Sequence, residues 1–291
     1  MKLLFEREID RLIAEGLFTV ERKKKFLSWI LNASKARSQN ILSARENQYD
    51  KAEELLTWYT FAPLLRMSQH QRNEAITALL KEVSPNVSFE CDFQVYFERL
   101  LPSPKPYLEG LKRRVSGHPV RYIRQEGGRH IKENLPLEGD THIDLLIESR
   151  ELLVPVEAKF TADISCGTTY DAERNQIARN IDVAIGEAEK STPHKKIIFL
   201  LCVPERFAKA KSRLYIYKME EYGKDPGVLQ GELGHRSSEE LKLVVGMGLI
   251  TWEKTLEIIY GSSVENNLVG DWELDVLREF YGERGIGFSP F

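Results

Sequence analysis

The sequence lacks the residue patterns on which several large classes of proteins depend. Its 291 residues include only three cysteines, which lie far apart and form no CxxC pair. This count argues against a disulfide framework, a zinc ribbon and a four-thiolate iron–sulfur cluster. The motifs GxSxG, GxxxxGK(S/T) and HExxH are absent, and the glycine pairs at 246/248 and 285/287 lack the strand and helix that frame a dinucleotide site.

The sequence also has no long hydrophobic run. Its longest apolar stretch outside the N-terminus, Ile197 to Val203, is far shorter than the roughly 18 residues that a membrane span requires. Charges at Glu6, Arg7 and Glu8 interrupt the apolar residues at the N-terminus, which argues against a signal peptide. With 42% hydrophobic and 29% charged residues, the chain is expected to be a globular cytoplasmic protein without a membrane partner.

The net charge of −3 hides two basic segments. Residues 20–45 contain seven Lys or Arg and one Glu, and residues 105–132 contain eight Lys or Arg and two Glu, so each segment carries a local charge of +6. Local potential, rather than total charge, attracts phosphate groups. Either segment alone is equally consistent with a solvated helix face.

The chain changes character near residue 84. Before it, apolar residues recur at helical spacing, and Ser68 with Gln71 forms a capping-box pattern for a helix that ends near Val83. We therefore divide the chain into three parts: an N-terminal helical region, a core, and a C-terminal extension of mixed strand and helices that packs on the core. Their bounds are 1–84, 85–210 and 211–291.

The core pattern predicts an α/β fold. Phe89, Phe93, Phe97 and either Leu100 or Leu101 fall on one helical stripe, so the core is expected to open with a helix. Alternating or dense apolar residues then predict strands, and helical spacing predicts helices. The order of helix, three strands, helix and strand indicates a mixed central sheet flanked by helices. The expected strands are 120–126, 141–149, 152–160, 196–203 and 213–219; the expected helices are 107–115, 174–190, 238–246 and 251–260, with a glycine-rich loop over 223–238.

Three charged residues fall on two neighbouring strands of this core. Side chains alternate between the faces of a strand, so Glu157 and Lys159 point the same way, as do His142 and Asp144 on the strand before. A hairpin of this length can bring Asp144 beside Glu157. Two adjacent carboxylates repel unless a cation lies between them, and oxygen ligands in small number suit Mg²⁺ or Mn²⁺. The pattern therefore predicts a metal site with an ammonium group beside it.

The arrangement of Asp144, twelve intervening residues, and Glu157-Ala-Lys159 at the end of an apolar strand resembles the signature of the PD-(D/E)xK phosphodiesterase superfamily, whose fold is restriction-endonuclease-like. The resemblance covers roughly residues 85–205. It implies a nuclease in which Asp144 and Glu157 bind Mg²⁺ or Mn²⁺, with the backbone carbonyl of Ala158 as a further ligand, and Lys159 is catalytic. One departure is Ile143, which stands where many members have proline.

The same resemblance suggests further residues. Gln176 and Arg179 match a glutamine-led motif on the helix after the lysine strand, where Gln176 would hold the lysine, a metal-bound water or the phosphate, and Arg179 would pair with phosphate. An accessory acid on the helix before the first strand would be Glu90 or Glu98. Nucleic acid would be held by basic residues of the 105–132 segment: Lys112, Arg113, Arg114, Arg121, Arg124, Arg129 and Lys132.

Other interpretations stay open at this point. Glu157 and Lys159 could form a surface pair on an edge strand, with Asp144 merely solvated. The principal hypothesis is a metal-dependent nuclease acting on DNA in restriction, defence, repair or the processing of mobile elements. The alternative is a catalytically silent nucleic-acid-binding module, or a subunit of a larger nucleoprotein complex. In either case, the N-terminal helices offer a surface for a homodimer or for a partner protein.

Overall fold

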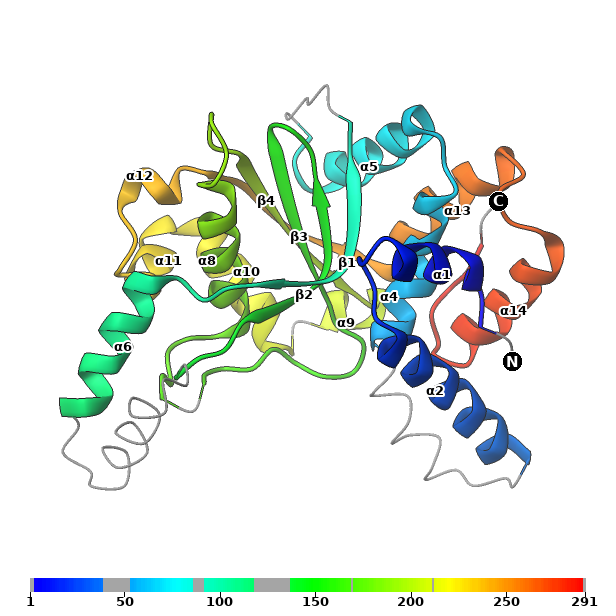
Figure 1. The fold of residues 1–291 in the computed structure, drawn as a ribbon, viewed down its shortest axis with the longest axis horizontal. Coiled ribbons are helices and arrows are strands. Elements are labelled where there is room, and N and C mark those ends of the chain that lie inside the picture. The colour runs from blue at the N-terminus through cyan, green and yellow to red at the C-terminus, as the bar shows by residue number, and fades with distance from the viewer. Residues whose placement is uncertain are drawn as a thin grey trace.

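A five-stranded mixed sheet flanked by helices forms the centre of the molecule (Figure 1). The computed structural model describes residues 3–38, 53–85, 92–117, 137–168, 170–210 and 212–289. The strands lie in chain order across the sheet, and the first three are antiparallel whereas the last two run parallel to the third. Their bounds are β1 (Gln94–Leu101), β2 (Thr141–Glu148), β3 (Leu152–Ala158), β4 (Lys196–Val203) and β5 (Val244–Thr251).

The strands predicted at 141–149, 152–160 and 196–203 are confirmed as β2, β3 and β4. A tight reversal joins β2 to β3, and Leu145 faces Val156 across this pair. Parallel neighbours need a long crossover connection. The helix predicted over 174–190 supplies it between β3 and β4, as α8 (Gln176–Ala188).

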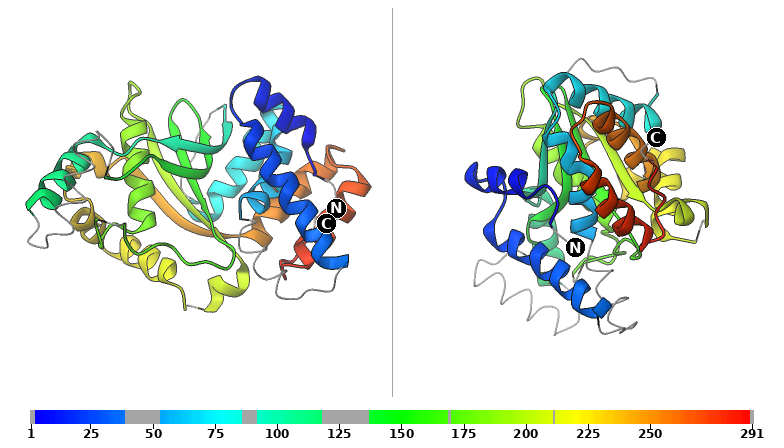
Figure 2. Two further views of the ribbon diagram at one scale, coloured as in Figure 1. Left: turned by 60° about the horizontal axis from the view of Figure 1, so that its bottom comes forward. Right: turned by 90° about the vertical axis from the view of Figure 1, so that its right-hand side faces the viewer.

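One set of helices covers one face of the sheet and includes both ends of the chain (Figures 1 and 2). Arg66 bonds both Glu8 and Glu273, which ties the first helix to the last. The expected capping box is present, because Ser68 and Gln71 exchange hydrogen bonds at the start of the fifth helix. This set comprises α1 (Glu6–Ala14), α2 (Val20–Ser38), α4 (Glu53–Phe61), the 3₁₀ helix η2 (Ala62–Leu65), α5 (Gln69–Val83), α13 (Trp252–Glu265) and α14 (Asp271–Gly282).

The other face carries α8 together with a group of shorter helices. The helix expected over 107–115 is present as α6, which projects from the body of the molecule (Figure 1). The remaining bounds are α6 (Lys105–Gly117), α9 (Glu205–Ala210), α10 (Leu214–Lys224), α11 (Pro226–Glu232) and α12 (Ser238–Leu241). No helix in the described ranges is long and apolar enough to cross a membrane.

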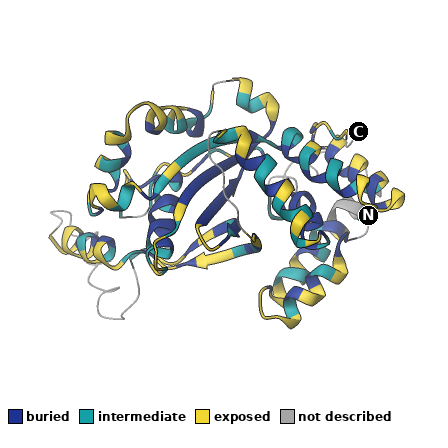
Figure 3. Cartoon of the chain, turned by 90° about the horizontal axis from the view of Figure 1, so that it is seen from above, coloured by how far each residue is buried: buried dark blue, intermediate teal, exposed yellow. Residues whose placement is uncertain are grey.

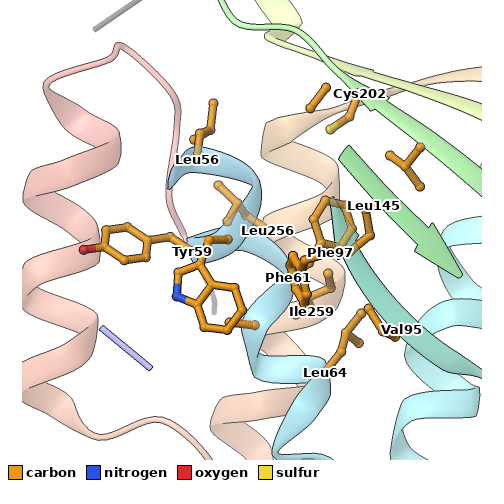
Figure 4. Packing of buried hydrophobic residues seen from close by; sticks show 14 of the residues in the cluster. Leu56, Tyr59, Phe61, Leu64, Val95, Phe97, Leu145, Cys202, Leu256 and Ile259 are labelled. Atoms are coloured by element: carbon orange, nitrogen blue, oxygen red, sulfur yellow. The ribbon is translucent and has the colours of Figure 1, made fainter. Parts of the chain in front are cut away.

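Alternate side chains of the central strands supply two separate cores. On β4, Ile198, Leu200 and Cys202 face the helices at the chain ends, whereas Phe199 and Leu201 face α8. Strands β3 and β4 are accordingly buried almost throughout, and the centre of the sheet is dark blue in Figure 3. Figure 4 shows the first core, where aromatic and aliphatic residues of α4, β1 and α13 meet: Tyr59, Phe61, Phe97, Leu256 and Ile259. The described residues before 85 and after 211 thus share these cores with the sheet.

The prediction of a helix over residues 89–101 was wrong from residue 92 onward, and residues 89–91 lie outside the described ranges. Strand β1 forms there instead, and Phe93, Val95 and Phe97 are buried at the strand period of two. Phe93 and Phe97 satisfy the helical spacing as well, because every fourth residue also shares one face of a strand, whereas Leu101 enters the core on the other face. Pairing with β2 along the whole strand decides between these periods.

Three predictions after residue 210 were also wrong. The expected strand at 213–219 lies in helix α10, which buries Tyr215 and Ile216 in the second core. The helix expected over 238–246 ends at Leu241, and strand β5 follows. The loop expected over 223–238 contains α11. The strand predicted at 120–126 lies outside the described residues.

Gly248 lies in strand β5 although glycine is unfavourable in strands, and the close approach of α5 explains its presence there. A Cβ atom on Gly248 would lie 2.3 Å from the Cβ of Val83. Because only glycine avoids this collision, α5 can pack closely against the edge of the sheet. The glycine pair at 246/248 is therefore a packing feature of a strand.

Candidate active site

The candidate site lies where β3 ends, on the side of the sheet that faces α8. Strand β3 buries every residue from Leu152 to Ala158, including Glu157. Leu153 on the same face as Glu157 packs in the core beneath α8. The alternation predicted from the sequence therefore aims Glu157 and Lys159 at α8, while Val156 and Ala158 enter the opposite core.

Glu157 is the best-connected residue of the site. Its Oε1 accepts hydrogen bonds from Gln176 Nε2 at 2.5 Å and from Lys159 Nζ at 2.8 Å, and its Oε2 accepts one from Asn180 Nδ2 at 2.5 Å. Gln176 and Asn180 are four residues apart on α8, so both side chains lie on one face of the helix. Asn175 caps that helix by accepting a hydrogen bond from Ala178 N. The end of α8 thus holds a buried carboxylate in one orientation.

Asp144 lies beside Glu157 at the end of the β2–β3 ladder. Its Oδ2 accepts a hydrogen bond from the backbone N–H of Ala158 at 2.8 Å, where a strand partner would otherwise accept it. Burial raises the pKa of Asp144 well above its usual range, and the nearby carboxylates of Glu157 and Glu98 raise it further; the Ala158 N–H and Lys159 oppose this only in part. Negative charge at Asp144 is therefore under-compensated by the protein itself.

Lys159 completes the predicted trio. Its side chain is only 9% exposed, with Nζ 2.8 Å from Glu157 Oε1 and 3.9 Å from Glu53 Oε2. Burial lowers the pKa of Lys159, but Glu157 and Glu53 together outweigh it, so the pKa is raised overall. The amine is therefore a cation with carboxylate neighbours. The edge-strand interpretation is wrong, because β3 pairs with a strand on each side.

Glu98 extends the row of carboxylates to a third strand. The register pairs Phe97 with Leu145 and Arg99 with Ile143, so Glu98 lies across from Asp144. The expectation that Glu98 belongs to a helix was wrong, because it lies within β1 and its φ is 53°, a strained value for a residue with a side chain. Its Oε2 is 2.7 Å from Arg22, and its Oε1 is buried without a hydrogen-bond partner in the described structure. Burial, above all, raises the pKa of Glu98 to about 7.

The other predicted residues lie at various distances from this cluster. Arg179 is half-buried on α8, and its Nε has no hydrogen-bond partner among the residues described. Lys112, Arg113 and Arg114 are exposed on α6, and Arg114 pairs with Asp171 at 2.8 Å. Residues outside the described ranges are Glu90, Arg121, Arg124, Arg129 and Lys132.

Three site residues were missed by sequence reasoning. Asn180 follows Arg179 directly on the helix of the glutamine-led motif, and its spacing of four residues from Gln176 was the signal that could have revealed its role. Glu53 and Arg22 come from helices more than 70 residues away in sequence from the residues that they contact. No local pattern marks them, because only the tertiary fold brings α2 and α4 to the end of β3.

The donor set fits a hard divalent cation. Asp144, Glu157 and the Ala158 carbonyl would supply oxygen ligands, which Mg²⁺ and Mn²⁺ prefer. Two buried oxygens near Glu157, Glu98 Oε1 and Asn180 Oδ1, have no hydrogen-bond partner in the described ranges, and the charge of Asp144 lacks a matching cation. Among the described residues, however, no group of three or more His, Cys, Asp or Glu side chains is placed to hold a metal ion.

Comparison with known proteins gave no relative from which a function could be transferred. No protein-family model matches the chain, and searches of the curated proteins and of the solved structures found no match.

Proposed function

We propose that this protein is a metal-dependent phosphodiesterase that hydrolyses nucleic acid, specifically DNA, and that its fold is restriction-endonuclease-like. The observation that carries the proposal is the cluster at the end of β3, where Asp144, Glu157, Lys159 and Gln176 meet. The order of β1, β2, β3, α8 and β4, with β4 parallel to β3, agrees with such a fold. Each of the four residues was predicted for the site from the sequence.

The metal would be held by Asp144 and Glu157 with the carbonyl of Ala158. Bound there, Mg²⁺ or Mn²⁺ would acidify a water molecule and neutralise charge on the scissile phosphate. The chain's own residues orient the reactants: Gln176 and Asn180 fix the carboxylate of Glu157 from α8. Lys159, as a buried cation, is placed to stabilise the negative charge that builds on the phosphate.

Substrate would be gripped by the basic residues of α6. Lys112 and Arg113 are exposed, and their side chains are therefore available for phosphate contacts that depend on salt but carry no sequence information. The expectation of a homodimer, or of a partner bound through the N-terminal helices, stays a prediction.

The proposal is tested by incubating the purified chain with double- and single-stranded DNA in Mg²⁺, in Mn²⁺ and in EDTA. Cleavage is expected with metal only, and Lys159→Ala should reduce it by about 10³-fold. RNA of the same sequence tests the choice of DNA. Cleavage that persists in EDTA, or at the wild-type rate in Lys159→Ala, would contradict the proposed chemistry.

One observation favours the alternative of a catalytically silent nucleic-acid-binding module. Lys159 already neutralises Glu157, and no cluster of three metal-ligating side chains occurs in the described part of the chain. If this alternative holds, DNA binding will be independent of metal, will weaken steeply with salt, and will be accompanied by no cleavage of any substrate.

A further inference from the structure

Two helices that are remote in sequence each form a hydrogen bond with the end of strand β3. Glu53, at the start of α4, accepts a hydrogen bond through Oε1 from the backbone N–H of Phe160 at 2.7 Å. Trp252, at the start of α13, donates its Nε1–H to the carbonyl of Lys159 at 2.9 Å. The peptide unit that follows Lys159 is thus fixed at both of its polar groups. Neither helix belongs to the segment from 85 to 210 that the sequence assigned to the core.

Glu53 acts on the side chain of Lys159 as well as on the backbone. While Oε1 binds Phe160 N, its Oε2 lies 3.9 Å from Lys159 Nζ. The amine therefore lies between two carboxylates, Glu157 on its own strand and Glu53 on α4. Two opposed anions restrict a flexible lysine far more than one ion pair does, since a lysine head group is a point charge on four rotatable bonds.

The packing around these contacts leaves little freedom for the strand end. Trp252 is fully buried, and its indole packs at 6.4 Å, centroid to centroid, from the ring of Phe61 at the other end of α4. Phe160 is buried in the same core. The two helices that bind the strand end therefore also bind each other through aromatic contacts.

We propose that Glu53 is a positioning residue for Lys159, so that the N-terminal helical region forms part of the active site. The proposal rests on the proposed function for its catalytic consequence, but the positioning itself is a property of the folded chain. Glu53 accepts a hydrogen bond from the peptide after Lys159 through one carboxylate oxygen, and its other oxygen lies 3.9 Å from the amine and restricts it. Trp252 holds the adjoining carbonyl, so it is the second positioning residue.

Lysine labelling tests the positioning without any need for catalysis. Wild type, Glu53→Gln and Glu53→Ala are reacted with an amine-acetylating reagent, and modification at each lysine is measured by mass spectrometry. Lys159 is expected to react about threefold or more faster in Glu53→Ala, because a flexible amine freed from one of its two ion pairs leaves its buried position more often. Lys242, which is 69% exposed and lies far along the chain, is the internal reference.

Steady-state kinetics test the catalytic consequence. In Glu53→Ala, kcat for DNA cleavage should fall about tenfold or more, with KM changed less than about twofold, because the amine is misplaced while the DNA-binding surface is intact. Glu53→Gln keeps an oxygen for Phe160 N and should recover part of kcat. Glu239→Gln, in an exposed ion pair with Lys242, is the matched control and should behave as wild type.

Trp252→Phe keeps an aromatic ring in the core but removes the N–H that binds Lys159 O. It should also lower kcat, and by less than Glu53→Ala. Thermal melting of each variant identifies a folding defect; if Glu53→Ala fails to fold, Glu53→Gln decides by the same labelling ratio.

Wild-type labelling of Lys159 in both folded Glu53 variants would overturn the proposal, as would unchanged kcat in Glu53→Ala. If the wild-type protein does not cleave DNA at all, the proposed function fails, while the labelling result still decides the role of Glu53.

Discussion

The molecule has two buried clusters of charge, and they differ in how the charges balance. One surrounds Asp182 on α8, whose carboxylate contacts His235, Arg174 and Arg236 at 3.0 Å or less. The other contains Asp144, Glu157 and Glu98, with Lys159 and Arg22 as the cations beside them. Asp182 is surrounded by cations, whereas Asp144 has other carboxylates as its strongest electrostatic neighbours.

The pKa values record this difference. Burial raises the pKa of Asp182, but the hydrogen bond from His235 and the charges of Arg174 and Arg236 outweigh it and lower the pKa overall. The pKa of Asp144 is raised. Removing one partner from a compensated buried network is destabilising, whereas carboxylates with raised pKa values held close together are typical of functional sites. The carboxylate of Asp182 is thus compensated by its own cations, whereas that of Asp144 is compensated only in part by Lys159 and the Ala158 N–H.

The largest effect is expected for Asp144→Asn. The amide keeps an oxygen that can accept the Ala158 N–H, but it loses the negative charge, so cleavage should fall by about 10³-fold or more, or about 4 kcal/mol in the barrier. The free energy of unfolding should stay the same or rise, since a buried and repelled charge is removed. Cleavage assays and urea unfolding of one preparation check both parts. Strong destabilisation without loss of activity would show that Asp144 is structural.

Asp182→Asn should lower the free energy of unfolding, which is the opposite of the effect expected for Asp144→Asn. Removing the charge leaves the buried guanidinium groups of Arg174 and Arg236 without their shared carboxylate, which should cost about 3 kcal/mol of stability at neutral pH. The folded-state pKa of Asp182 is lowered, so its contribution is present above its ordinary pKa of 3.8 and is lost as the pH falls through the folded value. Urea unfolding at pH 7 and in acid checks this. An equal deficit at both pH values would contradict it.

Glu98→Gln should change the free energy of unfolding with a pH dependence opposite in sign to that of Asp182→Asn. Since the folded pKa of Glu98 is raised from 4.5 to about 7, its contribution to stability is present below pH 4.5 and is lost as the pH rises to about 7. The amide of Glu98→Gln does not ionise, so the variant does not lose this stability as the pH rises. It should therefore match wild type in acid and exceed it above pH 7 by at most about 3 kcal/mol. Equal unfolding curves across this range would count against an uncompensated Glu98.

The smallest effects are expected on α6. Lys112→Ala and Arg113→Ala should each weaken DNA binding and reduce the slope of log affinity against log salt by about one unit, while the rate at saturating DNA is unchanged. Arg114→Ala is the matched comparison: its guanidinium is engaged by Asp171, so its effect should be smaller. Salt titrations of fluorescent DNA measure all three. Identical slopes in every variant would place the binding surface elsewhere.

The sequence predicted the parts of the site that a short stretch of chain encodes. β2, β3 and β4 are dense in apolar residues, and alternation along β3 assigned Glu157 and Lys159 to one face. Gln176 follows from its position at the start of the next helix. The partners that balance these charges could not be predicted, because Arg22 and Glu53 approach only through the packing of α2 and α4 on the sheet.

The mistaken elements have a related cause. The aromatic residues of β1 satisfy strand and helix periods together, and the aromatic and aliphatic residues of α10 are typical of strands although one side of that helix is buried against the sheet. The intrinsic preference of a residue for helix or strand is weak, and tertiary packing overrides it in these two elements. In β5, a helix was expected up to residue 246, whereas the glycine at 248 lies in a strand and admits Val83 of α5.

The central claim is that Asp144 and Glu157 share a divalent cation beside Lys159. The most direct measurement is anomalous diffraction from crystals soaked in Mn²⁺, compared with crystals of Asp144→Asn under the same conditions. We predict a manganese peak between the two carboxylates in the wild-type protein and no peak there in the variant. A wild-type crystal with no peak at that position, and with Glu157 still paired to Lys159, would contradict the account.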